Sequence, residues 1–317
     1  MMNTYRPEGL TIGTLQNREL LSLGRCGLEK AMAMGAILES TAILCDGDMN
    51  IHVDLNGIEG IIPRSEVCYT QVGEPIKDIA IITRVGKPVC FKVLSVVEDG
   101  GKIRAILSRR QAQMECMGNY VADLIPGDII CSRVTHMESF GAFVDIGCGI
   151  ISLLSVDCIS VSRFSHPRDR LYNGMVINTV LKSVDRDKGR IFVSMRELLG
   201  TWEENAALFS AGQTVAGIIR SVESYGVFVE LAPNLAGLAE LKDDAEVCRC
   251  ECGKLAAVYI KSIIPDRMKI KLVLIDSYLD EPCNRTLKYF VDCESIRHID
   301  HWQYSPIGCK KVIETRF

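Results

Sequence analysis

Residues 127–146 read GDIICSRVTHMESFGAFVDI, and residues 212–231 read GQTVAGIIRSVESYGVFVEL. The two stretches align without a gap at a constant offset of 85 positions (212 − 127), so that Phe140 corresponds to Tyr225. A supersecondary unit that recurs within one chain predicts a repeat architecture. The repeated part contains two aromatic residues around a glycine and no nucleophile–base pair, which favours a stacking surface over a catalytic site.

Both repeats continue in the same way. Residues 174–195 read GMVINTVLKSVDRDKGRIFVSM, and residues 253–274 read GKLAAVYIKSIIPDRMKIKLVL. Their alternating, β-branched-rich pattern predicts strands. Five short strands in roughly 70 residues, with an irregular loop between the third and the fourth, are typical of a small closed barrel of the OB type.

A weaker copy precedes these two. Residues 35–55 read GAILESTAILCDGDMNIHVDL and keep the apolar pattern. Asp54 is the counterpart of Asp145, but Met49 and His52 stand in the aromatic places. We expect this copy to fold as a barrel and to serve as a docking surface, because it has lost both aromatic residues.

The segments between the repeats are rich in helix formers. We therefore predict an all-β protein with short helical linkers, built from three tandem five-stranded OB-fold barrels. The predicted segments are an N-terminal helical segment (1–34), a degenerate barrel (35–108), a helical linker (109–126), a second barrel (127–195), a second helical linker (196–211), a third barrel (212–276) and a C-terminal tail (277–317).

Composition indicates an ordinary globular protein, with 48% hydrophobic and 24% charged residues. No apolar run is long enough to span a bilayer, and no signal peptide is apparent, so we expect a cytoplasmic protein without a membrane partner. The net charge of −4 argues against simple polycation binding. Any affinity for nucleic acid would depend on stacking and a few placed cations.

Fourteen cysteines in a cytosolic chain are expected to be reduced. Cys45, Cys90, Cys131 and Cys148 lie among apolar neighbours, where cysteine behaves as a small hydrophobic residue. The exception is the run CRCEC at 248–252, whose three thiols would share one face of a strand. Structural zinc usually requires paired CxxC motifs, which are missing, so we predict no metal and no cofactor.

No P-loop, GxGxxG or GxSxG motif occurs, and no pair of acidic residues has further support. The histidines at 298 and 301 are interpreted as surface polar residues beside Trp302. We therefore predict that the protein is not an enzyme.

Several motifs resemble the S1 RNA-binding domain family. They are FGAFVDIG (140–147) and DRDKGRIFVS (185–194) in the second repeat, and SYGVFVEL (224–231) with AGLAEL (236–241) in the third. A degenerate repeat, two good ones and an aromatic tail are also similar to short bacterial ribosomal protein S1-like proteins with tandem repeats. The resemblance implies OB-fold barrels that bind RNA.

The residues that the resemblance places in contact with RNA are Phe140, Phe143, Asp185 and Arg190 in the second repeat, and Tyr225, Phe228 and Lys269 in the third. Lys182 and Lys261 recur at matching positions, and we include them as RNA contacts, with ordinary solvent-facing lysines as the alternative. The chain departs from the family at the histidine of the third strand, which is Pro63, Ser155 and Glu240 in the three repeats. Pro265 replaces the family aspartate in the third repeat.

These residue types suit single-stranded RNA, because every base has a flat face that stacks on an aromatic ring. Residues three apart on a regular strand point to opposite faces. We therefore expect a bend or bulge between the two rings, at Gly141 and Gly226. The alternative is that the rings belong to the core. For Asp145 and Glu230 the plain alternative is that they are solvated strand-end residues.

The leading hypothesis is a single-stranded RNA (mRNA) binding protein that acts in translation at or near the small ribosomal subunit (30S), as a monomer. One alternative is an accessory factor of RNA processing or decay. Another is a protein-interaction scaffold with reduced RNA binding, because the family histidine is substituted in all three repeats. Two linked barrels with intact rings favour RNA binding, since linking weak sites raises avidity.

Overall fold

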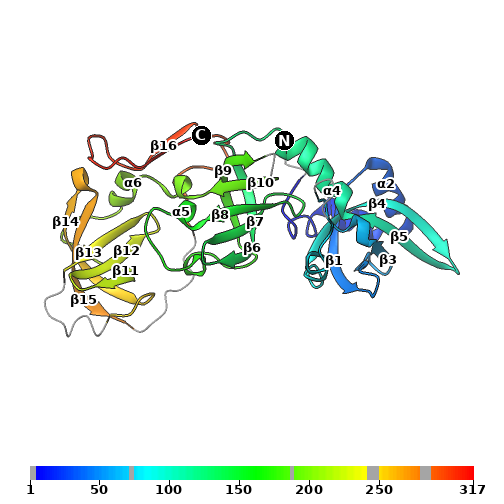
Figure 1. Cartoon of the computed structure of the whole chain (residues 1–317), viewed down its shortest axis with the longest axis horizontal. Coiled ribbons are helices and arrows are strands. Elements are labelled where there is room, and N and C mark those ends of the chain that lie inside the picture. The colour runs from blue at the N-terminus through cyan, green and yellow to red at the C-terminus, as the bar shows by residue number, and fades with distance from the viewer. Residues whose placement is uncertain (1–4, 71–74, 186–188, 241–249, 279–286) are drawn as a thin grey trace. The chain divides into compact units, whose positions relative to one another are not determined.

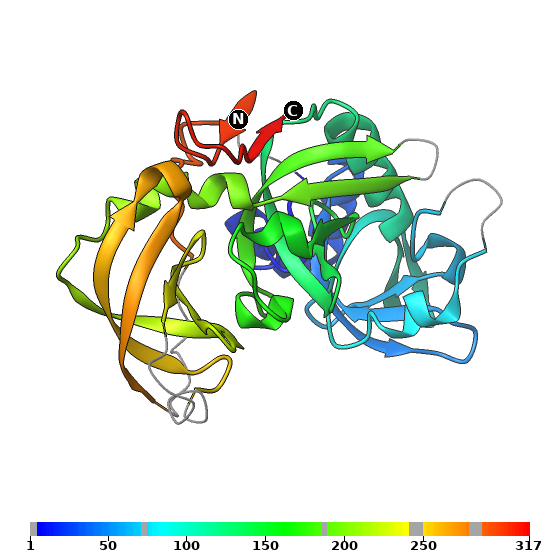
Figure 2. The ribbon, with the colours of Figure 1, turned by 60° about the vertical axis from the view of Figure 1, so that its left-hand side comes forward.

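The computed structural model describes residues 5–70, 75–185, 189–240, 250–278 and 287–317. It contains three closed five-stranded barrels (Figures 1 and 2), as the sequence predicts. The first comprises β1 (Leu38–Cys45), β2 (Ile51–Asp54), β3 (Glu59–Ile62), β4 (Pro88–Asp99) and β5 (Lys102–Ser108). The second comprises β6 (Ile129–Glu138), β7 (Gly141–Asp145), β8 (Ile151–Ser155), β9 (Val176–Asp185) and β10 (Arg190–Ser194). The third comprises β11 (Thr214–Glu223), β12 (Gly226–Ala232), β13 (Leu235–Ala239), β14 (Leu255–Ile264) and β15 (Lys269–Ser277).

Strand order is the same in all three barrels. The first three strands form a meander, the third pairs with the fifth in parallel, and the fourth closes the barrel against the first. This is the OB arrangement, in which closure leaves no unpaired sheet edge.

Short helices stand before, between and within the barrels. They are α1 (Leu15–Ser22), α2 (Gly24–Met34), α3 (Asp78–Ile82), α4 (Arg109–Cys116) with a π-helical continuation (Met117–Val121), α5 (Val156–Ile159) and α6 (Trp202–Ala206), with 3₁₀ turns at Arg64–Glu66, Pro167–Asp169, Arg196–Leu199 and Pro265–Arg267. Local chemistry sets their ends. The Ser108 hydroxyl accepts the Gln111 N–H and so begins α4, while Gly35 adopts φ 62° and ends α2.

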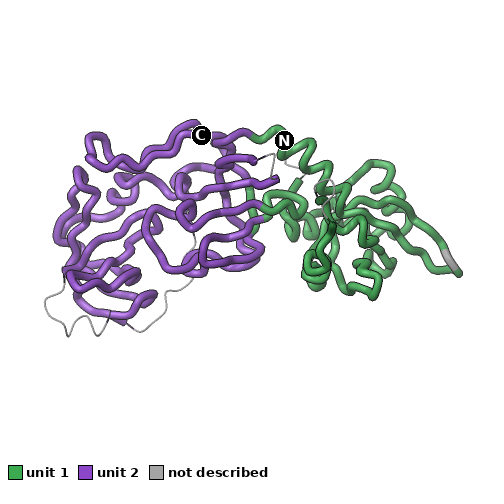
Figure 3. The backbone as a smooth tube through the Cα atoms, viewed as in Figure 1, with its two compact units in different colours: residues 1–124, 131–133, 145–151 green, residues 125–130, 134–144, 152–317 purple. Residues whose placement is uncertain are grey.

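The chain divides into two compact units (Figure 3), which are described separately. Unit 1 comprises residues 1–124, 131–133 and 145–151, and unit 2 comprises 125–130, 134–144 and 152–317. The strands β6, β7 and β8 therefore contribute residues to both units.

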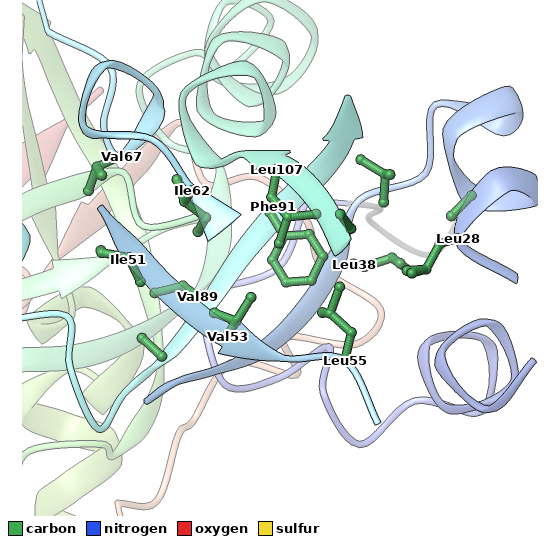
Figure 4. Packing of buried hydrophobic residues seen from close by; sticks show 14 of the residues in the cluster. Leu28, Leu38, Ile51, Val53, Leu55, Ile62, Val67, Val89, Phe91 and Leu107 are labelled. Atoms are coloured by element: carbon green, nitrogen blue, oxygen red, sulfur yellow. The ribbon is translucent and has the colours of Figure 1, made fainter. Parts of the chain in front are cut away.

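A cluster of buried apolar side chains forms the core of the first barrel (Figure 4). Phe91 lies at its centre, with Leu38, Leu107 and Val53 around it, and all four side chains are buried. Burying one such side chain stabilises a fold by about 1.5–3 kcal/mol. The barrel thus has a complete core although it lacks the aromatic motif of the other repeats.

Unit 1 also holds a buried ionic cluster. Glu8 bonds Arg109 through two contacts, 2.6 Å to Nε and 3.0 Å to Nη2, and Arg84 lies 3.6 Å away. The Glu8 N–H donates to Asp145 Oδ2 at 2.7 Å. Asp145 is only 1% exposed and also accepts the N–H groups of the following turn, at 147 and 149. The interpretation of Asp145 as a solvated strand-end residue is therefore wrong.

The matching carboxylate of the third barrel is buried too, in unit 2. Glu230 is 2% exposed and pairs with Arg170 and Arg220, each at 2.7 Å. The buried Asn234 lies nearby in the chain and accepts the Val161 N–H, so barrel residues and the segment before β9 are joined by polar contacts. Glu230 is a structural ion-pair residue, because a buried carboxylate is stable only when it is paired.

The C-terminal tail belongs to unit 2 and packs on the barrels there. Trp302 and Tyr304 belong to the core cluster of the third barrel, and Tyr289 and Phe317 pack against a small cluster at the second. The strands β16 (His301–Gln303) and β17 (Glu314–Arg316) pair within the tail. His298 bonds Asp128 at 2.8 Å, so this histidine anchors the tail through a carboxylate.

The cysteines differ in their surroundings. Cys90 and Cys148 are buried as expected, but Cys131 is exposed, because its side chain alternates to the outer face of β6. Cys250 and Cys252 lie outside any strand, and Cys248 falls outside the described residues. Among the residues that the structure describes, no group of three potential ligands could hold a metal ion.

Candidate nucleic-acid interface

The first ring of each aromatic pair lies in a turn. β6 ends at Glu138 and β7 begins at Gly141, so Phe140 belongs to the two-residue turn between them. Tyr225 occupies the matching turn of the third barrel. The expectation that a strand bends between the two rings of each pair is therefore wrong, because the first ring lies in the turn and not in a strand. The glycine has another use: a Cβ at Gly141 would lie 2.5 Å from the Leu154 carbonyl oxygen, so glycine permits close packing of β7 on β8.

The two aromatic pairs have almost the same geometry. The ring centroids of Phe140 and Phe143 are 6.0 Å apart with planes at 88°, and those of Tyr225 and Phe228 are 6.2 Å apart at 89°. Phe140 is 54% exposed and Tyr225 62% exposed, while the second ring of each pair is partly buried. Core aromatic side chains are buried, whereas this first ring is exposed at the same place in two repeats, so it is not a core residue.

The second barrel brings Asp185 and Arg190 together. They are partners where β9 and β10 pair, at the end of β9 and the start of β10, and Arg190 is exposed. Around the barrel, β8 lies between β10 and the aromatic strand β7. In the third barrel the exposed Lys269 pairs with Ile264, and Pro265 begins a 3₁₀ turn there. The third barrel thus keeps a cation at this tip without the aspartate.

The two recurring lysines occupy matching irregularities. The pairing register shifts at Lys182 in β9 and at Lys261 in β14, and both side chains are exposed. Lys182 Nζ lies 3.4 Å from Cys158 Sγ in α5. Their contact with RNA stays a prediction.

Glu240 takes the place of the family histidine in the third barrel. Its carboxylate is exposed and lies 4.0 Å from Lys271 Nζ. A surface pair of this kind is weak, but it partly offsets the negative charge that a phosphate would meet.

Sequence reasoning missed one ring. His136 in β6 lies beside Phe143, with ring centroids 6.3 Å apart and planes at 17°. Its position in the strand just before the aromatic turn was visible in the repeat alignment, where Ser221 is the matching residue.

The first barrel carries an ionic network at the equivalent hairpin. His52 bonds Asp46 at 3.1 Å and Glu59 at 3.0 Å, and Arg104 bonds Glu59 at 2.9 Å. Hydrogen bonds, first from Asn50 and then from His52, hold the pKa of Asp46 at about 2. Its carboxylate therefore stays charged, and no ring pair is available for stacking.

The second barrel matches a known protein family. Residues 123–196 match the family model described as the S1 RNA binding domain. The second barrel is an S1 domain.

Two curated relatives bear the name of a ribosomal protein. The chain is 30% identical to small ribosomal subunit protein bS1 of Leuconostoc lactis over 194 residues, which cover 60% of the chain and 43% of the relative. It is 31% identical to a bS1 homolog of Bacillus subtilis over 190 residues, covering 58% of the chain and 47% of the relative. The chain thus spans less than half the length of these curated relatives.

A solved structure from Streptococcus pneumoniae, titled a multidomain protein with nucleic acid binding domains, is also similar. Identity is 18%, the alignment covers 76% of this chain and 74% of that one, and the TM-score is 0.24.

Among the described residues, no helix is both long and apolar enough to cross a membrane.

Proposed function

We propose that this S1-domain chain binds single-stranded RNA, with mRNA as its target, through the ring pairs of the second and third barrels. The observation that carries the proposal is the recurrence of an exposed, edge-to-face ring pair, Phe140 with Phe143 and Tyr225 with Phe228. Bases of any sequence stack on such rings, and each stacked base contributes about 1–3 kcal/mol.

The cations complete the proposed site. Arg190 and Lys269 stand at matching hairpin tips, and Lys182 and Lys261 at matching register shifts. Phosphates of a strand that stacks on the rings would pair with such residues. Asp185 faces Arg190 and would orient its guanidinium.

We also propose that the chain acts in translation, at the small ribosomal subunit, without enzymatic activity and as a monomer. The names of the curated relatives support this assignment. The first barrel, which lacks the ring pair, would dock on the ribosome or on another protein.

The test is a comparison of one labelled RNA strand with its duplex by fluorescence anisotropy at a fixed salt concentration. We expect the single strand to bind at least tenfold more tightly, because duplex bases are not free to stack on the rings. Equal affinity for both forms would overturn the proposal. Sedimentation with small ribosomal subunits at low salt, against fractions that contain RNA-decay enzymes, separates translation from decay.

A further inference from the structure

The side chain directly across from the second ring differs among the three barrels. In the third barrel, Ser221 of β11 pairs with Phe228 of β12. His136 and Phe143 are the matching residues of the second barrel, which explains why their rings meet. In the first barrel the place opposite His52 is held by Leu44. Of these three places, only the one in the S1 domain carries a ring.

The His136 ring is part of the surface. Its side chain is 56% exposed, and its Nε2 lies 2.6 Å from the Glu138 carboxylate on the same strand. On the adjoining strand, the Phe143 carbonyl oxygen accepts the Thr135 hydroxyl at 3.0 Å, which ties β6 to β7 at this point. The histidine ring is therefore not part of the barrel core, and its nitrogen pairs with a carboxylate on the same strand.

The orientation suits stacking. The His136 and Phe143 planes are within 17° of parallel, whereas Phe140 meets Phe143 edge-on at 88°. Histidine is among the side chains on which RNA bases stack. The near-parallel pair thus extends the aromatic surface from the turn across β7 and onto β6.

This extension runs away from the strand where the resemblance places a histidine. That place is Ser155 on β8, and β8 and β6 lie on opposite sides of β7. The second barrel therefore lacks a ring on one side of its aromatic strand and carries one on the other side.

We propose that His136 is a third stacking ring, and that the second barrel holds one more RNA base than the third barrel. The inference rests on the proposed function, since it assigns a further base position to the same surface. The ligand is a single-stranded RNA segment that crosses β7 toward β6.

The experiment uses the full chain with Tyr225→Ala and Phe228→Ala, so that only the second barrel contributes rings. Oligouridylates of increasing length are titrated by anisotropy, with and without His136→Ser, which copies the residue of the third barrel. We expect His136→Ser to weaken binding about fivefold or more and to shorten the protected length by one nucleotide. His136→Phe should restore the affinity, because it restores a ring without the imidazole nitrogens.

A reciprocal variant tests the same idea in the third barrel. In a chain with Phe140→Ala and Phe143→Ala, Ser221→His should tighten binding and lengthen the protected segment. A thermal melt of each variant checks that the barrels remain folded.

The outcomes separate the two proposals. If Phe143→Ala weakens binding and His136→Ser does not, the assignment of His136 as a third stacking ring is wrong and the proposed function stands. The inference is also overturned if His136→Phe weakens RNA binding as much as His136→Ser does, since the loss of the ring would then not be the cause. If neither Phe143→Ala nor His136→Ser has an effect, RNA binding by this surface is itself refuted.

Discussion

The first and second barrels share one strand order but carry opposite surfaces at the hairpin between their first two strands. The second has a two-residue turn that exposes Phe140 beside Phe143. The first has a longer loop in which His52 is held between Asp46 and Glu59. Because both barrels close with the same strand order, the fold is kept while this hairpin changes from an exposed ring pair to an ionic network. The two barrels therefore serve as internal controls for each other.

Their strand-end carboxylates differ as well, and this predicts the largest effect. Asp145 is buried and accepts three backbone N–H groups, whereas Asp54 is exposed and accepts only that of Gly57 among the contacts described. Each buried N–H without an acceptor costs about 1–3 kcal/mol. We expect Asp145→Ala to lower the free energy of unfolding of unit 1 by about 3 kcal/mol.

Urea unfolding near neutral pH, followed by circular dichroism, measures this difference. Asp54→Ala is the matched control and should cost less than about 1 kcal/mol. Equal losses for the two variants would contradict the contrast between the barrels.

The buried carboxyl of Asp145 also predicts a pH dependence. Burial, and then the charge of Glu8, raises the pKa of Asp145 from 3.8 to about 7. Between these values the folded chain binds a proton that the unfolded chain has released, so this group lowers the stability as the pH rises. Its contribution to the slope is at most about 1.4 kcal/mol per pH unit.

Unfolding at a series of pH values from about 4 to 8 tests the sign. The natural chain should lose stability relative to Asp145→Asn as the pH rises over this range, since asparagine does not titrate. A constant difference for Asp145→Asn would show that its carboxyl is ionised throughout.

Removal of the rings should affect RNA binding without affecting the fold. Phe140→Ala with Phe143→Ala should weaken single-strand binding roughly tenfold or more, because each lost stacking contact costs about 1–3 kcal/mol. Met49→Ala with His52→Ala, at the matching places of the first barrel, should change the affinity less than about twofold. Anisotropy at one salt concentration gives both values. Loss of a cooperative melt in the ring variant would instead identify the rings as core residues.

The smallest effect is expected at the hairpin tip. Arg190 in the second barrel matches Lys102 in the first, at the start of the fifth strand in each. Arg190→Gln should weaken binding a few-fold and reduce the slope of log affinity against log salt by about 0.7, the value for one phosphate contact on a single strand. Lys102→Gln should leave the slope unchanged. If Lys102→Gln reduced the slope and Arg190→Gln did not, the phosphate contact would lie on the first barrel.

The repeats were sufficient to predict the three barrels and the four aromatic residues. Strand alternation and turn residues are local properties, so they are readable without tertiary contacts. The identical spacing of Phe140 with Phe143 and of Tyr225 with Phe228 indicated a shared site for the same reason.

Other features depended on contacts between distant parts of the chain. The buried carboxylate of Asp145 accepts the N–H of residue 8, which is 137 positions away, and no local pattern records such a partner. The C-terminal tail likewise gains its place from packing on barrels that precede it. His136 was visible in the alignment, but only the cross-strand pairing of β6 with β7 set its ring beside Phe143. The sequence by itself therefore determined which elements form and which rings recur, while tertiary structure decided which polar groups are buried and which side chains share a surface, because burial and contact depend on neighbours far along the chain.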